Sequence, residues 1–243
     1  MIKTAIFVEG QTELILVREM LLRLFEYQNI CLECFKLLKG NTRPTEYPFG
    51  ERSAVYYFQI ISVGGDDAVL TSILKLEKYL WNSGFDRIIG LRDMFSKNYR
   101  KLSRERKIDL SLNQKFIEGS RKTIEEKAEQ PDKIFFSFAI MEAEAWLLGI
   151  PIAFERMNED LTIKNIAKSL NINLNEIDPE TEFFHPSNQV KAIFDLTENK
   201  YKKRKGDVSA LVNCMKKENY DMLHESEKCA SFSTFYKHLP SQE

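Results

Sequence analysis

Acidic residues follow short apolar stretches of this sequence, and their spacing is suited to binding a divalent cation. Glu9 comes directly after the apolar run 5–8, and Glu13 follows four residues later. If a helix begins near Thr12, both carboxylates can face one point. Two carboxylates held this close repel each other unless a cation joins them, and Mg²⁺ is the obvious candidate. The alternative is that Glu9 ends a strand and Glu13 occupies the acid-rich first turn of a helix.

The same pattern recurs at two other predicted strand ends: Asp93 follows the predicted strand 87–91 after Arg92, and Glu142 and Glu144 follow the predicted strand 133–140. The carboxyl ends of parallel strands lie at one edge of a sheet, so acids far apart in the chain can converge there. Carboxylates grouped in this way hold Mg²⁺ or Mn²⁺ ions about 3.5–4 Å apart in two-metal phosphoryl-transfer sites. The pattern therefore predicts a metal site at this edge.

Each of these later acids also has a simpler explanation. Asp93 can be a strand terminator or a partner for Arg92, which precedes it. Glu142 and Glu144 can favour the N-terminus of a helix through its macrodipole and do nothing more.

Apolar periodicity predicts the elements that would position the acids. Strands are predicted over 5–8, 30–38, 55–63, 87–91 and 133–140, and helices over 12–27, 67–83, 108–130 and 141–149. Asp67 would cap the second of these helices. This alternation is typical of a mainly parallel α/β sheet covered by helices. Residues 40–53, with two prolines and two glycines, are predicted to be a long loop or flap.

Strand patterns disappear beyond Pro151. Helices are predicted over 161–170, 187–199, 207–219 and 231–239. We therefore expect an α/β domain over residues 1–150 and a helical C-terminal region over residues 151–243, packed on that domain.

Composition limits the classes of function. With 43% hydrophobic residues the chain can bury a sizeable core, and its formal net charge of −1 does not by itself indicate nucleic-acid binding. The C-x-x-C of Cys31 and Cys34 has no second pair at zinc-site spacing, so we do not favour a zinc site. Neither a signal peptide nor a long apolar run is present, and we expect a cytoplasmic protein.

Two local basic runs offer contacts to phosphates. Residues 97–107 carry six basic residues against one Glu, and residues 200–205 carry five, each run including a tyrosine. The candidate nucleic-acid contacts are Arg100, Lys101, Arg104, Lys202 and Arg204. Such side chains neutralise phosphates, and Tyr99 and Tyr201 could stack on unpaired bases. Solvated surface charge is the alternative.

The sequence resembles a TOPRIM-like family of uncharacterised bacterial proteins. The resemblance rests on Glu9-Gly10-Gln11-Thr12-Glu13, on Asp93, on the segment 142–148, and in the tail on His185-Pro186, Tyr201-Lys202-Lys203 and the segment 229–239. TOPRIM is the fold of topoisomerase and primase catalytic domains and of OLD-type nucleases. We read His185 itself as packed or hydrogen-bonded in a turn.

This resemblance implies roles for individual residues. Glu9 would be the strand-one acid, a metal ligand or general acid/base, and Glu13 would help to hold a second metal. Asp93 would be the first acid of an Asp-x-Asp motif. Phe95 stands where the second Asp is expected, so Glu142 or Glu144 would have to supply the missing ligand. Lys203, in the Tyr-x-Lys segment, would stabilise charge in the transition state.

The resulting expectation is a Mg²⁺- or Mn²⁺-dependent nuclease acting on DNA or tRNA. The resemblance further implies an ABC-type ATPase partner and a role in anti-phage defence, and it allows a homo-oligomer. The alternative is a non-catalytic subunit that keeps the fold and binds the basic surface of a partner protein with its acidic edge.

Overall fold

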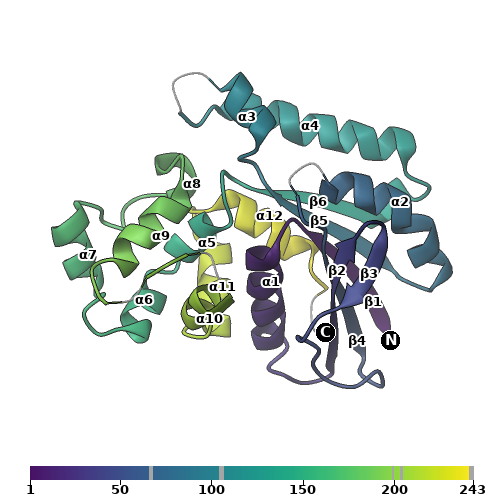
Figure 1. Ribbon diagram of the computed structural model, residues 1–243, viewed down its shortest axis with the longest axis horizontal. Helices are drawn as coiled ribbons and strands as arrows, with labels where there is room; N and C mark the ends of the chain where they lie inside the picture. The colour runs from purple at the N-terminus through teal and green to yellow at the C-terminus, as the bar shows by residue number, and fades with distance from the viewer. Residues whose placement is uncertain (66–67, 104–106, 199, 203–204, 241–243) are drawn as a thin grey trace. The chain divides into compact units, whose positions relative to one another are not determined.

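The computed structural model describes residues 1–65, 68–103, 107–198, 200–202 and 205–240 (Figure 1). The chain forms two compact units, each built from more than one stretch of sequence. The first unit comprises Met1–Arg92, Ser111–Phe138 and His238–Glu243, and the second comprises Asp93–Leu110 and Ala139–Lys237.

A six-stranded, mostly parallel sheet confirms the predicted α/β fold. Its strands stand in the order β3-β2-β4-β1-β5-β6. The bounds are β1 Ile2–Val8, β2 Ile30–Leu38, β3 Asn41–Pro44, β4 Tyr56–Ser62, β5 Arg87–Asp93 and β6 Ile134–Ala139. β1 pairs in parallel with β4 and β5, and β4 pairs in parallel with β2. The central strands β1, β4 and β5 are mainly apolar because such sheets are covered on both faces.

Helices cover both faces of the sheet. Alternate residues of β4 point in opposite directions. Phe58 packs with Phe25, just after α1 (Gln11–Leu24), at a ring-centroid distance of 5.4 Å. Tyr57 belongs instead to the core shared with Ile73 of α2 (Ala68–Asn82) and Ile124 of α4 (Leu110–Lys127). The predicted cap of α2, Asp67, lies outside the described residues.

The prediction of a long loop or flap over residues 40–53 is wrong in its first part. Residues Asn41–Pro44 form the edge strand β3, which turns back and pairs antiparallel with β2 (Figure 1). Farther along, the backbone of Phe49 exchanges two hydrogen bonds with Leu32, 2.8 and 2.9 Å long. The segment therefore protects the edge of β2, whose backbone groups would otherwise lack partners.

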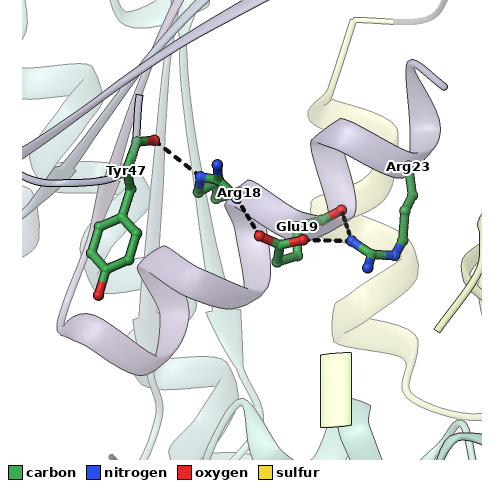
Figure 2. A network of polar contacts seen from close by, with 4 residues as sticks. All are labelled: Arg18, Glu19, Arg23 and Tyr47. Atoms are coloured by element: carbon green, nitrogen blue, oxygen red, sulfur yellow. Dashed lines mark hydrogen bonds and ion pairs between the residues drawn. The ribbon is translucent and has the colours of Figure 1, made fainter. Parts of the chain in front are cut away.

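A polar network on α1 binds the part of this segment that follows β3, through the backbone of Tyr47. Figure 2 shows the guanidinium of Arg18 reaching both the backbone of Tyr47 and the carboxylate of Glu19, which also accepts from Arg23. The Arg18–Tyr47 hydrogen bond is 3.0 Å long. Gly50 then passes so close to β2 that a Cβ atom there would lie 2.1 Å from a backbone oxygen.

The second unit is helical, as predicted for the C-terminal region. Its helices are α3 Lys97–Leu102, α5 Glu144–Leu148, α6 Ile152–Met157, α7 Ile163–Leu170, α8 Pro179–Glu182, α9 Pro186–Phe194, α10 Lys205–Val212, α11 Lys217–Glu225 and α12 Ala230–His238. Trp146 is central to this core, with Phe232 and Phe235 at ring-centroid distances of 5.4 and 5.6 Å. The prediction of a single helix over 207–219 is wrong, because a non-helical segment separates α10 from α11.

Candidate functional site

Asp93 is the last residue of β5, and its carboxylate is attached to the start of α5. Its Oδ1 accepts a 2.9 Å hydrogen bond from the backbone N–H of Ala143, the residue between Glu142 and Glu144. Two backbone hydrogen bonds extend the pairing of β5 with β6. The N–H of Met94 donates to the carbonyl of Ala139, and the N–H of Phe95 donates to the carbonyl of Met141, each at 2.8 Å. The structure thus brings Asp93 to the segment that carries the two glutamates.

Glu142 and Glu144 are both buried and each connects α5 to a later segment. Oε2 of Glu142 accepts a 2.8 Å hydrogen bond from the backbone N–H of Ser187, in the first turn of α9. A carboxylate in this position is favoured by the dipole of the helix that it contacts. Oε1 of Glu144 accepts a 2.9 Å hydrogen bond from the hydroxyl of Tyr201. These two carboxylates therefore order α9 and the segment that follows it.

Glu9 and Glu13 belong to the first unit. Glu9 directly follows β1 and is half-buried. Oε2 of the buried Glu13 accepts a 2.8 Å hydrogen bond from the backbone N–H of Gly10, which caps the start of α1. This contact matches the simpler explanation for Glu13, an acid in the first turn of a helix.

Phe95, which stands where the sequence resemblance leads one to expect a second Asp, belongs to an aromatic cluster. Its ring centroid lies 5.5 Å from that of Phe184 and 4.6 Å from that of His185. His185 directly precedes α9 and also contacts the ring of Phe184, at 4.9 Å. His185 is therefore packed, as predicted, although it lies at the start of a helix rather than in a turn.

Both tyrosines of the basic runs are buried, so the prediction that they stack on unpaired bases is wrong. Tyr99 has no exposed surface and Tyr201 is 3% exposed. Their hydroxyl groups contact the backbone of Asp109 and the carboxylate of Glu144. The exposed cations of these runs include Arg100, Lys101 and Lys202, whereas Arg104, Lys203 and Arg204 lie outside the described residues.

The donor chemistry of the acidic residues fits a hard divalent cation, because all of them offer carboxylate oxygens. Across the part of the chain that the structure describes, however, no three His, Cys, Asp or Glu side chains are grouped as a metal site. Cys31 and Cys34 are free, buried thiols, three residues apart on β2. Burial raises the pKa of Cys34 to about 12, which leaves it a poor metal ligand unless it is deprotonated.

No protein-family model, curated protein or solved structure matches this chain. Among the described residues, no helix has both the length and the apolar character needed to cross a membrane.

Sequence reasoning missed a buried acid in the second unit. Oε1 of Glu180, in α8, accepts a 2.9 Å hydrogen bond from the indole of Trp146, and Oε2 accepts from the backbone of Ser231 at 3.1 Å. The hydroxyl of Ser231 also donates to Oε1. Burial raises the pKa of the Glu180 carboxyl to about 7. The local sequence Pro-Glu-Thr-Glu is that of an ordinary polar helix start, so it carries no signal of this burial.

Proposed function

We propose that this protein is a divalent-metal-dependent nuclease that hydrolyses phosphodiester bonds in DNA or tRNA. The observation that carries the proposal is the hydrogen bond from Ala143 to Asp93. It attaches a buried carboxylate at the end of a strand to the segment that holds two more buried carboxylates, Glu142 and Glu144. Oxygen ligands of this kind are those that Mg²⁺ and Mn²⁺ prefer.

In this proposal Asp93 and either Glu142 or Glu144 hold the cation. The backbone donors of Ala143 and Ser187 orient two of these carboxylates, as outer partners of metal ligands commonly do. Glu9 and Glu13 are included among the proposed ligands only because of the sequence resemblance. A bound cation would polarise a phosphoryl oxygen and lower the pKa of an attacking water.

Exposed cations supply the proposed contacts to nucleic acid. Arg100, Lys101 and Lys202 belong to the second unit, as does Asp93. Their charges would neutralise phosphates, which makes binding depend on salt concentration. The ABC-type ATPase partner and the role in anti-phage defence follow from the resemblance and are part of the same proposal.

Cation binding is tested first by thermal unfolding. Mg²⁺ or Mn²⁺ that binds only the folded protein raises the melting temperature, and Asp93→Asn is expected to abolish most of that rise. Asp195→Asn is the matched control, because Asp195 is an exposed residue at the C-terminus of α9. A metal-induced rise that is the same in both variants would contradict the role of Asp93.

Hydrolysis is tested by incubating plasmid DNA and total tRNA with Mn²⁺. We expect cleavage by the unmodified protein and by Asp195→Asn, and a loss of at least about 100-fold in Asp93→Asn, since the cation stabilises the charge of the transition state. Glu9→Gln separately tests the contribution of the first unit. Cleavage that persists in Asp93→Asn would overturn the proposal.

A second candidate function is a non-catalytic subunit that binds a partner protein. The observation that favours it is the packing of Phe95 against Phe184 and His185, where a second Asp is expected. For this candidate, the metals do not change the melting temperature and no cleavage occurs.

A further inference from the structure

The first unit contains a pocket that does not include any of the proposed nuclease residues. It has a volume of about 760 Å³ and lies on the face of the sheet formed by β1, β2 and β4, beside α2. Residues at its wall include Lys3, Glu33, Arg52, Gln59, Tyr79 and Phe85. Its volume is within the range of pockets that hold small molecules, about 300–1,000 Å³.

Polar side chains interrupt the apolar pattern of the sheet at this pocket. Glu33 of β2 and Gln59 of β4 are direct neighbours across the two strands. Gln59 in turn is level with Ala5 of β1, so this row crosses the middle of a parallel sheet. Strands with two neighbours in such a sheet are normally apolar, and exceptions to a local pattern are expected at functional positions.

Glu33 is held by a network at the wall of the pocket. Its Oε1 accepts from Nε and Nη2 of Arg52, at 2.9 and 2.7 Å, and its Oε2 accepts from the hydroxyl of Tyr57 at 2.6 Å. Arg52 is 79% exposed at its side chain, and its Nη1 has no hydrogen bond among the described residues. The guanidinium therefore retains donors that face solvent.

Gln59 retains unused hydrogen-bonding capacity. Its side chain is half-buried, and within the described part of the chain neither its amide oxygen nor its amide nitrogen makes a hydrogen bond. An amide presents a donor beside an acceptor, which matches the paired acceptor and donor, N7 and N6, on the edge of adenine. Leaving such a group unpaired inside a pocket is unfavourable unless a ligand or water satisfies it.

The remaining walls suit a flat ring and an anionic group. Phe35, Ile61 and Leu76 provide apolar surface, and Tyr57 and Phe85 provide aromatic surface. The charged residues at the wall are two cations, Lys3 and Arg52, and Glu33, whose carboxylate is already paired. Lys3 donates to the backbone oxygen of Ser83 at 2.9 Å, which fixes its ammonium group beside the ring of Phe85.

We propose that this pocket binds an adenine nucleotide. The amide of Gln59 pairs with N6 and N7 of the base, the apolar and aromatic walls cover the ring, and Arg52 and Lys3 contact the phosphate. Since the pocket residues and the acidic residues of the candidate nuclease site are different, binding can be measured without any nuclease activity. A failure of one proposal therefore leaves the other intact.

Calorimetric titration of the full chain with AMP tests the proposal. AMP is expected to bind saturably to one site per chain, adenosine more weakly because it lacks the phosphate, and ribose 5-phosphate more weakly still because it lacks the base. Absence of saturable AMP binding overturns the proposal. So does a ribose 5-phosphate affinity equal to that of AMP, because the base would then contribute nothing.

Substitutions in the pocket test which residue contacts the base and which contacts the phosphate. Gln59→Leu is expected to weaken AMP and adenosine alike, by about tenfold or more. Arg52→Gln should weaken AMP several-fold and leave adenosine unchanged. Arg121→Gln is the matched control, because Arg121 is 80% exposed, pairs with Glu125 on α4 and is not part of the pocket.

Folding is checked by the melting temperature of each variant. If Gln59→Leu does not fold, Gln59→Asn shortens the same amide and is expected to weaken base binding by a similar factor. An AMP affinity that is unchanged in a folded Gln59 variant overturns the proposal.

Discussion

Glu33 in the first unit and Glu180 in the second are both carboxyl groups withdrawn from bulk water, yet their pKa values move in opposite directions. Burial alone would raise the pKa of Glu33, but the hydrogen bonds from Tyr57 and Arg52 outweigh it and lower that pKa. Burial dominates at Glu180 and raises its pKa to about 7, although Ser231 and Trp146 donate hydrogen bonds to it.

The difference between the two carboxyl groups lies in their donors and in their access to water. Arg52 brings a positive charge to Glu33, whose side chain remains 23% exposed. The donors to Glu180 are an indole, a hydroxyl and a backbone amide, all neutral, and Glu180 is 4% exposed. Hydrogen bonds from neutral groups satisfy a carboxyl group, but a nearby cation is more effective in keeping it ionised.

The largest expected difference between the two carboxyl groups appears on truncation. Glu180→Ala leaves the buried donors of Trp146 and Ser231 without an acceptor, and we expect it to lower the free energy of unfolding by about 3 kcal/mol. Glu33→Ala should cost about 1 kcal/mol, because Arg52 can turn to water. The first unit contains Trp81 and the second contains Trp146. In a protein that carries Trp81→Phe, the fluorescence of Trp146 therefore reports the denaturant unfolding of the second unit. Equal losses of stability in Glu180→Ala and Glu33→Ala would contradict the proposed difference between the two carboxyl groups.

The next effect is a dependence of stability on pH. Between the ordinary value of 4.5 and about 7, folded Glu180 binds more protons than unfolded Glu180. Raising the pH through this window therefore favours unfolding, by an amount of order 1–3 kcal/mol. Glu180→Gln should remove this decline, measured as the denaturant midpoint at several pH values. A decline of the same size in Glu180→Gln would show that another group causes it.

Glu33 is expected to have the opposite pH dependence. Because its pKa is lowered in the folded state, its contribution to stability is present above the ordinary value of 4.5 and is lost as the pH falls through the folded pKa. In a Trp146→Phe background, where Trp81 reports the first unit, Glu33→Gln should show a smaller loss of stability on acidification than the unmodified protein. An identical acid-side loss would contradict the role of Glu33.

The smallest expected effect on stability is that of Arg52→Gln. The guanidinium is 79% exposed at its side chain, so its pair with Glu33 should contribute little to the free energy of unfolding. The same variant is expected to weaken AMP binding several-fold, and this contrast separates a binding role from a structural one. A stability loss as large as that of Glu180→Ala would show that Arg52 is mainly structural.

Most of the sheet and its helices could be predicted from local patterns. The predicted strand over 30–38 coincides with β2, and the strand over 55–63 contains β4. Long apolar or amphipathic runs are reliable because their period is repeated over many residues. β3 could not be predicted in this way, since Asn41–Pro44 is polar and exposed and is a strand only because β2 is beside it.

The candidate site was only partly visible in the sequence. Acids at strand ends were identified because strand and helix patterns flank them, and the structure attaches Asp93 to the segment between Glu142 and Glu144. The burial of Tyr99 and Tyr201 inside basic runs was not visible, because nothing local distinguishes a stacking tyrosine from a packed one. Glu180 was missed for the same reason.

By itself, the sequence determined the α/β class, the order of most elements and the placement of acids where strands end, because these depend on periodicity along the chain. Tertiary structure alone decided which polar groups meet. It connected Asp93 to Ala143, enclosed Glu180 with Trp146 and Ser231, and placed Glu33 beside Gln59. These contacts join residues 26 to 51 positions apart in the chain, so they depend on packing between elements, which no local pattern specifies.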